Sequence, residues 1–365
     1  MAKPVAIITA DWHLRKHDRI WPRRPTIVGD ASWGMQQIES LVASTGVKHI
    51  IILGDIFNER ILQSDTVTAM RALLTTFAAS DVQVSYIQGQ HERATPPWLC
   101  AIHSQPVWLH QQLFNLSDSI RIYGLDYQTP YDVREALSQV PKAANVLATH
   151  QVWKDLLTDD SGDAWFTWVP EHVQLILTGD YHVHCVRHDD YGRTVVSPGP
   201  LCIQKIDETG PHGVWLLHDD LTVTSQPLQT RQSTNVVIST AESLDAFVRE
   251  WPQNAARLPQ VGAPAAVAKG ILRVHYLASL PAVRERIERA VGTDVHLFWQ
   301  PSNPRTPQDT IEEQARVETV LERGMPGCIR EFYGDNAAAC SDAIRLWQSE
   351  DLRGEIETIV QERLG

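Results

Sequence analysis

The stretch Val5-Ala-Ile-Ile-Thr-Ala-Asp-Trp-His13 decides the fold. Its first six residues are apolar or β-branched, a pattern typical of a buried strand. An aspartate and a histidine follow at the carboxyl end of that strand. Ligands of open α/β sheets bind at the carboxyl ends of the strands. The stretch therefore predicts a buried strand that carries functional side chains at its end.

Similar runs recur along the first two-thirds of the chain. Strands are predicted at residues 47–53, 82–88, 120–125, 145–149, 175–178 and 194–197. Helices with apolar residues at three- and four-residue spacing are predicted at 31–44 and 66–79, between the early strands. This alternation predicts a layered α/β fold with at least partly parallel sheets.

The remainder of the chain changes character. Two strands and a turn are predicted within residues 212–228, and a loop rich in Pro, Ala and Gly at 253–268. A β-α-β unit is predicted over 271–299, in which Val283, Ile287 and Val291 share one helix face. The last fifty or so residues read as helical.

The bulk composition excludes several classes of protein. The 365 residues are 43% hydrophobic and 21% charged, which is typical of a soluble globular protein. No apolar run approaches the ~20 residues that span a bilayer. The five cysteines include no CxxC pair, so a reducing cytoplasm is expected. The net charge of −12 argues against a protein that binds DNA over a wide surface, but not against a nuclease with a local basic patch.

Five short polar motifs follow predicted strands. They are Asp11-Trp-His13, Gly54-Asp55, Gly89-Gln-His-Glu92, His150-Gln151 and Gly179-Asp-Tyr-His182. Each alone is compatible with an ordinary turn or a surface histidine, but five at strand ends predict a shared metal site. Carboxylate, imidazole and amide ligands suit manganese, iron or zinc better than calcium. The absence of cysteine ligands argues against a structural zinc.

The order of these motifs resembles the calcineurin-like metallophosphoesterase superfamily, whose signature reads D-x-H, G-D, G-N-H-[DE], H and G-H-x-H. The SbcD-type nuclease branch is indicated by His150-Gln151, by the turn Ser197-Pro-Gly-Pro-Leu201 and by the following strand at 214–217. The resemblance covers residues 4 to about 228.

The resemblance implies a two-layered β-sandwich flanked by helices, with a smaller α+β capping domain and C-terminal helices. The implied domains are a catalytic domain at 1–230, a capping domain at 231–305 and a helical segment at 306–365. The capping domain is expected either to help orient DNA or to act as a packing module.

The resemblance also implies two divalent metal ions, with Mn²⁺ expected. One ion would be bound by Asp11, His13, Asp55 and His182, and the second by Asp55, Gln90, His150 and Asp180. His91 would donate a proton to the leaving oxygen or stabilise charge on the phosphorane, and Glu92 would orient the His91 ring.

Three positions depart from the family pattern. Gln90 replaces the usual Asn, which keeps the amide oxygen on a longer side chain. Asp180 replaces the usual His, and its added negative charge favours harder ions such as Mn²⁺. In an alternative register, His182 and His184 would form the H-x-H pair. Asn58 stands where some relatives have a His, which puts the exonuclease mode in question.

A basic segment lies directly behind the first motif, with Trp12 and Trp21 interleaved. Its cationic residues are Arg15, Lys16, Arg19, Arg23 and Arg24. The segment is expected to bind DNA phosphates, with a tryptophan stacked on an exposed base. The alternative is a solvated loop.

The expected function is a DNA exo- or endonuclease of the SbcD type that acts with an SbcC-type ATPase. The amphipathic stretch 342–364 would dock that ATPase or pack on its own domain. A homodimer through residues 66–79 or 98–113 is also expected, and no membrane contact. The alternatives are a phosphodiesterase or phosphatase acting on a nucleotide or phosphoprotein, or a scaffold that has lost catalysis.

Overall fold

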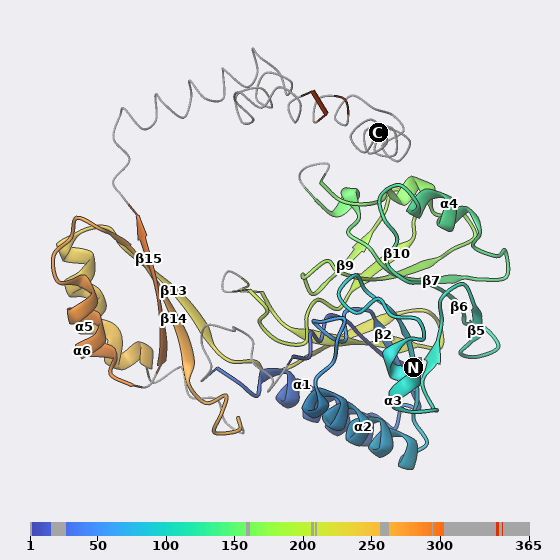
Figure 1. Cartoon of the computed structure of the whole chain (residues 1–365), viewed down its shortest axis with the longest axis horizontal. Helices are drawn as coiled ribbons and strands as arrows, with labels where there is room; N and C mark the ends of the chain where they lie inside the picture. Colours follow the sequence, from blue (N-terminus) through green and yellow to red (C-terminus); the bar gives the residue numbers. More distant parts are fainter. Residues whose placement is uncertain are drawn as a thin grey trace, which may run out of the picture. The chain divides into compact units, whose positions relative to one another are not determined.

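The computed structural model of the chain describes residues 2–15, 27–157, 161–205, 208, 210–255, 263–293, 295–302, 341–342 and 345 (Figure 1). None of the helices in these ranges is long and apolar enough to cross a membrane. Two six-stranded mixed sheets and one three-stranded sheet carry the fold.

The first large sheet has the strand order β12-β11-β1-β2-β3-β4. Its strands are β1 (Pro4–Thr9), β2 (His49–Leu53), β3 (Gln83–Ile87), β4 (Val107–Trp108), β11 (Gly213–His218) and β12 (Val223–Pro227). Strands β1 to β4 run parallel to one another. Strand β11 pairs antiparallel with β1, and β12 pairs antiparallel with β11 at the edge of the sheet.

The second large sheet has the order β5-β6-β7-β8-β10-β9. Its strands are β5 (Leu113–Asn115), β6 (Arg121–Leu125), β7 (Val146–His150), β8 (Leu175–Gly179), β9 (Cys185–His188) and β10 (Thr194–Ser197). The central strands β6, β7, β8 and β10 are parallel, and the two edge strands are antiparallel.

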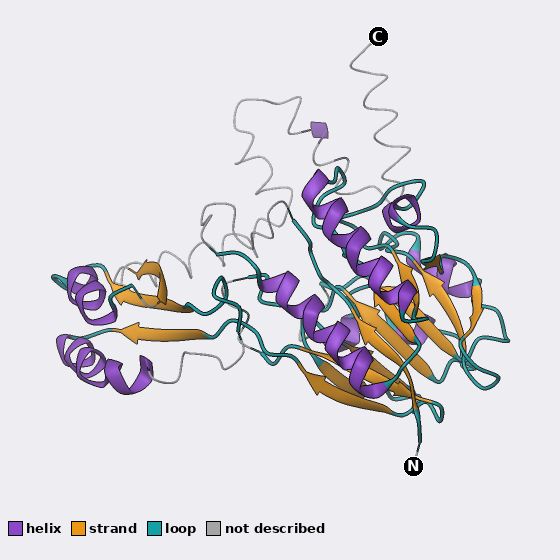
Figure 2. Ribbon diagram, turned by 90° about the horizontal axis from the view of Figure 1, so that it is seen from below, coloured by secondary structure: helices purple, strands orange, loops and turns teal. Residues whose placement is uncertain are grey.

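Alternation along β1 explains how the sheets and helices form layers. Successive side chains of a strand point to opposite faces of its sheet. Ile8 packs in a core with residues of both large sheets, such as Ile122 and Leu177. Its neighbour Ile7 packs on the opposite side, in a core with the helices α1 (Asp30–Thr45) and α2 (Ser64–Ala79). Figure 2 shows these helices against the strands.

The outer face of the second sheet has its own core. Tyr123, Leu147 and Ile176 pack there against α4 (Val133–Ser138) and the loop that follows β7. A further short helix, α3 (Trp98–Ile102), follows β3. The predicted α/β architecture, a two-layered β-sandwich flanked by helices, is therefore confirmed.

The three-stranded sheet lies in the range predicted for the capping domain. It consists of β13 (Ser233–Ile238), β14 (Gly270–Leu277) and β15 (Val295–Ser302), with helices α5 (Ala241–Ala255) and α6 (Val283–Val291). The buried face of α6 is formed by Val283, Ile287 and Val291, as predicted. Strands β9 and β13 and helix α5 were not predicted. The C-terminal helical segment lies outside the described residues, apart from Ser341, Asp342 and Arg345.

A buried ion pair joins the chain before β13 to the start of α1. The Arg231 guanidinium donates to both carboxylate oxygens of Asp30, at 2.9 and 2.8 Å. It also donates to the carbonyl oxygens of Lys269, Val28 and Ala266. Arg231 is 1% exposed and Asp30 is 2% exposed, so the pair is closed to water.

Candidate metal centre

The predicted motifs meet in one cluster around Asp55. The Asp55 Oδ2 atom lies 3.5 Å from His150 Nε2 and 3.7 Å from both His13 Nε2 and His91 Nε2. Asp55 follows β2, which borders both β1 and β3 in the first sheet. Its central place suits the bridging role implied by the resemblance.

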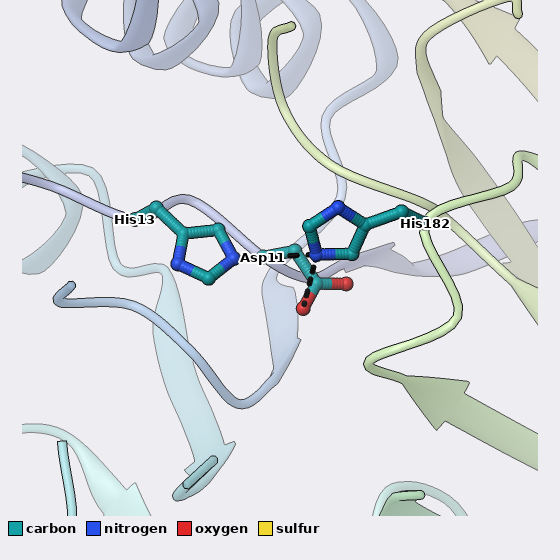
Figure 3. A group of neighbouring side chains, drawn as sticks. All are labelled: Asp11, His13 and His182. Atoms are coloured by element: carbon teal, nitrogen blue, oxygen red, sulfur yellow. Dashed lines mark hydrogen bonds and ion pairs between the residues drawn. The ribbon is translucent and has the colours of Figure 1, made fainter. Parts of the chain in front are cut away.

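The remaining predicted ligands complete this cluster. His182 Nε2 lies 3.8 Å from Asp11 Oδ1 and 3.3 Å from His13 Nε2. Figure 3 shows the side chains of these three residues together. Gln90 donates to Asp180 Oδ1 at 2.7 Å, and that oxygen lies 4.0 Å from His150 Nε2. We call this set the Asp55 cluster: Asp11, His13, Asp55, Gln90, His150, Asp180 and His182.

Three overlapping triads have ligand atoms close enough to share an ion. They are Asp11–His13–His182, His13–Asp55–His91 and Asp11–Asp55–His150. The first triad lies within the ligand set predicted for the first ion. The third combines Asp11, predicted for the first ion only, with Asp55 and His150 of the second ion's set. The second adds His91, which was predicted to be catalytic and not a ligand.

The unpaired atoms of the cluster test whether its residues fit metal ions. Asp55 Oδ2, His150 Nε2 and Gln90 Oε1 are buried and have no hydrogen-bond partner among the described residues. Buried polar atoms are normally paired, because an unpaired one costs free energy. These three atoms of the cluster are a carboxylate oxygen, an imidazole nitrogen and an amide oxygen, which are donors suited to a divalent ion such as manganese, iron or zinc. The residues therefore fit.

The backbone at the cluster is strained. Asp11, His13, Asp55 and Asp180 have φ angles of 52°, 46°, 48° and 70°. This left-handed region is uncommon for residues other than glycine, and its cost persists only where the surroundings hold it. The strained turns direct the side chains at the strand ends into one place.

Two motif glycines leave room for the cluster residues and their neighbours to pack closely. A Cβ atom on Gly89 would lie 2.0 Å from Asp55 Oδ1. A Cβ atom on Gly179 would lie 2.1 Å from the Leu53 carbonyl oxygen, which accepts a 2.5 Å hydrogen bond from His150 Nδ1. Only glycine fits at either position, so these residues are required by packing rather than by turn geometry.

Burial and mutual repulsion perturb the acids of the cluster. Burial raises the pKa of Asp11 to about 7, and the charges of Asp55 and Asp180 add to this rise. Burial alone would also raise the pKa of Asp55, but the adjacent His150 and His13 outweigh it and hold that pKa far below its usual range. Asp11 therefore binds a proton more tightly than an ordinary aspartate, and Asp55 less tightly.

The pKa values of two histidines in the cluster are also shifted in opposite directions. Burial lowers the pKa of His13 to about 3. Burial would lower the pKa of His150 too, but Asp55, Asp180 and Asp11 raise it well above its usual value. Without a cation, the cluster therefore retains protons on some groups that metal ligands must release.

Glu208 contacts the Asp55 cluster, and the sequence did not reveal this contact. His182 Nδ1 donates to Glu208 Oε1 at 2.7 Å, which leaves His182 Nε2 as the lone-pair atom on the side of Asp11. The second oxygen of Glu208 accepts from the backbone of Gln204 and Lys205. A carboxylate bonded to a ligand histidine fixes its tautomer and orientation.

The role predicted for Glu92 is wrong. Glu92 is buried, and its oxygens accept from the backbone N–H groups of Phe57 at 2.6 Å and Gly89 at 3.2 Å. The His91 ring instead donates from Nδ1 to the Asn58 carbonyl oxygen at 3.3 Å. A carboxylate committed to two backbone donors braces the motif loop and does not orient the ring.

His184 lies outside the cluster. Its Nδ1 pairs with the Pro198 carbonyl oxygen and its Nε2 with Ser225 Oγ, while its ring stacks on Trp215 at 4.7 Å between centroids. Both ring nitrogens are occupied away from Asp11. The geometry thus supports the register with Asp180 and His182.

The basic segment is described only in part. Arg15 lies near the cluster and donates to Gln204 Oε1 at 3.4 Å, and burial lowers its pKa. Lys16, Arg19, Arg23 and Arg24 lie outside the described residues, as does Trp21. Trp12 is fully buried and donates to Thr9 Oγ1, so the expectation that it stacks on a base is wrong.

No family model and no curated protein matches the sequence. A dimetal phosphatase from Danio rerio is similar in structure, with 12% identity over 62% of this chain and 97% of that one and a TM-score of 0.44. The nuclease MPE from Pseudomonas putida shares 14% identity over 61% of this chain and 87% of its own, with a TM-score of 0.28. A cold-active protein-tyrosine phosphatase from a psychrophilic Shewanella species shares 13% identity over 62% of this chain and 81% of its own, with a TM-score of 0.30. These similarities are distant and assign no activity to this chain.

Proposed function

We propose that the chain is a metal-dependent phosphodiesterase that hydrolyses DNA, with the Asp55 cluster as its active site. One observation carries the proposal. Three histidine nitrogens surround a single buried oxygen of Asp55, and that oxygen has no hydrogen-bond partner among the described residues. Such an arrangement costs free energy unless a cation completes it.

Two divalent ions bound there would supply Lewis-acid catalysis, by activating water and neutralising the charge that develops on a phosphoryl group. The chain prepares this site in advance. Glu208 holds the His182 ring with Nε2 on the side of Asp11. The Gln90 amide is held by its hydrogen bond to Asp180, which leaves Oε1 as the free ligand atom.

His91 is suited to proton transfer. Its side chain is 42% exposed, whereas that of Asp55 beside it is 1% exposed. The Nδ1–H group bonds to the Asn58 carbonyl oxygen, and Nε2 faces the cluster 3.7 Å from Asp55 Oδ2. We infer that His91 meets the substrate at the open side of the cluster and donates a proton to the leaving oxygen.

DNA is proposed as the substrate for two reasons. The basic segment 15–24 begins only two residues after the ligand His13. The 42% exposure of the His91 side chain also supports the proposal, because a polymeric substrate needs a solvent-accessible catalytic group.

The test is hydrolysis of labelled single- and double-stranded DNA with Mn²⁺, comparing wild type with His91→Ala. His188→Ala replaces an exposed histidine of β9 and is the matched control. We expect Mn²⁺-dependent cleavage that His91→Ala reduces by about 10²–10⁴-fold and the control does not. Turnover of bis-p-nitrophenyl phosphate without DNA cleavage would support the phosphodiesterase alternative. Tight Mn²⁺ binding without any turnover would support the scaffold alternative.

We also propose an SMC-like ATPase as partner and a homodimer, both from the family resemblance. The stretch 342–364 expected to dock the ATPase lies almost wholly outside the described residues. Helix α2, one of the two segments expected at a dimer interface, exposes residues such as Thr68, Arg71 and Thr75. Light scattering of the purified chain tests the dimer, and co-elution with an SbcC-type ATPase tests the partner. A monomer that does not co-elute would contradict both.

A further inference from the structure

Gln88 closes the loop that carries the third motif. It follows β3 directly and is 5% exposed. Its side-chain amide pairs with the backbone of Ala94 in both directions. Gln88 Oε1 accepts from the Ala94 N–H group at 3.1 Å, and Gln88 Nε2 donates to the Ala94 carbonyl oxygen at 3.2 Å. One buried side chain thus joins the two ends of the loop that holds Gln90 and His91.

Asp126 connects Gln88 to the other large sheet. It follows β6 of the second sheet directly, whereas Gln88 follows β3 of the first. Asp126 Oδ1 accepts from the Gln88 backbone N–H group at 2.7 Å, and Oδ2 accepts from Gln88 Nε2 at 3.3 Å. Trp108 Nε1 donates to both carboxylate oxygens at 3.0 Å. We call Gln88 and Asp126 the cross-sheet pair.

The cross-sheet pair lies at the edge where the predicted ligands of the second ion come from different sheets. Gln90 follows β3 of the first sheet, whereas His150 ends β7 and Asp180 follows β8 of the second. Glu92 bonds to the backbone of Phe57, which follows β2, and so braces the loop within the first sheet. A hydrogen-bonded pair between the ends of β3 and β6 instead fixes the loop against the second sheet.

We propose that Gln88 and Asp126 are positioning residues, which hold Gln90 and His91 in register with the ligands of the second sheet. Neither residue belongs to the Asp55 cluster, so both act through the loop and not on the substrate. Ligands and catalytic groups must be held to within about 0.5 Å, by side chains that are themselves locked by hydrogen bonds. The proposal rests on the proposed function, because it concerns the same site.

The first test is calorimetry of Mn²⁺ binding, which needs no substrate. Gln88→Ala removes the side chain that joins the ends of the loop. We expect it to weaken one of two Mn²⁺ sites by about 10–100-fold, the usual effect of removing support for a ligand. Asn145→Ala is the matched control and should leave both sites unchanged. The Asn145 amide also bonds to the backbone in both directions, with Arg121 N–H and the Ser119 carbonyl oxygen, but it precedes β7 and lies at the opposite end of that strand from His150.

An exchange of acceptor and donor separates positioning from a general loss of packing. Gln88→Glu sets a carboxylate against that of Asp126, where the wild-type amide donates, and should weaken Mn²⁺ binding at least as much as Gln88→Ala. Adding Asp126→Asn supplies an amide N–H group for the new carboxylate. The double variant should therefore bind Mn²⁺ at least about threefold more tightly than Gln88→Glu alone, the value of one net hydrogen bond.

Kinetics at saturating Mn²⁺ give a second readout. A misplacement of about 1 Å can reduce the rate about 10²-fold. We expect Gln88→Ala to lower kcat for DNA cleavage by about this factor and to change KM by less than about twofold, because the loop is needed in the transition state and not for binding DNA. Asn145→Ala should change neither constant.

Equal Mn²⁺ binding by the wild type and Gln88→Ala, or equal losses in Gln88→Ala and Asn145→Ala, would overturn the positioning role. If Gln88→Ala does not fold, Asp126→Asn alone replaces it, since it turns an acceptor for Gln88 Nε2 into a donor. An unchanged Mn²⁺ affinity in that variant would be equally damaging. Wild type that cleaves DNA beside variants that bind Mn²⁺ normally defeats only the positioning role. The expected changes in Mn²⁺ binding without any DNA cleavage defeat only the proposed function.

Discussion

The Asp55 cluster and the Arg231–Asp30 pair both bury charge, but they treat it differently. The Arg231 guanidinium is fully engaged, with both oxygens of Asp30 and three backbone carbonyl oxygens as acceptors. In the cluster, Asp55 Oδ2 and His150 Nε2 have no hydrogen-bond partner in the described structure. The first region satisfies itself and therefore holds the chain together. The second is incomplete and therefore indicates a ligand.

The contrast predicts which residues matter for stability and which for function. Removing one partner of a complete buried pair leaves the other charge unpaired, so stability falls. Removing one charge from an incomplete cluster relieves repulsion in the metal-free protein but destroys the site. The two regions should consequently respond to substitution in opposite directions.

The largest effect is expected from Asp11→Asn. We expect hydrolysis with Mn²⁺ to fall at least about a thousandfold, because one predicted metal ligand loses its charge. Burial raises the pKa of Asp11 to about 7, so its charged form is unfavourable in the metal-free protein. The melting temperature in EDTA should therefore stay level or rise. Loss of both activity and stability would break the comparison.

Arg231→Met should show the reverse pattern. The variant leaves Asp30 buried without its partner, which is expected to lower the free energy of unfolding by about 3–5 kcal/mol. Activity per folded molecule should change by less than about twofold, because Arg231 belongs to a separate network from the Asp55 cluster. Urea denaturation followed by tryptophan fluorescence measures the first quantity.

Two controls sharpen this prediction. Adding Asp30→Leu to Arg231→Met should recover much of the lost stability, since the unpaired charge is then removed. Arg286→Met breaks an ion pair with Asp245 whose side chains are 38% and 59% exposed, and should cost less than about 1 kcal/mol. Equal losses for Arg231→Met and Arg286→Met would show that burial does not matter here.

Glu208→Gln tests whether Glu208 supports metal binding or only the local structure. The amide oxygen still accepts from His182, but the variant loses the negative charge and the one acceptor, Oε2, that Gln204 and Lys205 share. Mn²⁺ affinity measured by calorimetry should fall about 10–100-fold, the usual effect of removing a partner of a ligand histidine. Excess Mn²⁺ should restore activity. An unchanged affinity would make Glu208 purely structural.

The smallest expected effect is a dependence of stability on pH. Burial raises the pKa of Glu92 to about 8, and the pKa values of His150 and His182 are also raised. Each group binds its proton more tightly when folded, so stability is lost as pH rises through its folded pKa. The lowered pKa values of Asp55 and His13 change the pH dependence of stability only below about pH 7. Metal-free protein should thus melt a few degrees lower at pH 9 than at pH 7. Melting that is higher at pH 9 would contradict this.

The parts of the fold that could be predicted are those whose signal is local. Strand β1 and its motif lie in ten consecutive residues, and the opposite orientations of Ile7 and Ile8 place one helix layer and one sheet on either side of the strand. Parallel strands bring their ends to one edge, so the cluster follows once the strands are known. Strand β13 was missed because its apolar residues do not alternate regularly, and Val237 is 68% exposed.

The parts that could not be predicted depend on contacts between distant residues. The pairing of Arg231 with Asp30 spans 201 positions, and neither residue lies in a recognisable motif. Glu208 lies in a loop without periodicity, so nothing in the sequence connects it with His182. Trp12 was grouped with the basic segment as a residue that could stack on a base, but the turn that directs Asp11 and His13 into the cluster buries it in the core.

The left-handed turns of the Asp55 cluster also bear on how such a site could be lost by descent. Asn tolerates this conformation better than most residues, whereas β-branched residues do not. A single base change converts an Asp codon to an Asn codon. Replacement of Asp11, Asp55 or Asp180 by Asn would abolish a charged ligand at little cost to the backbone. A single mutation could therefore produce a homologue that folds well but lacks a charged ligand. Asn at position 11, 55 or 180 would identify such a homologue.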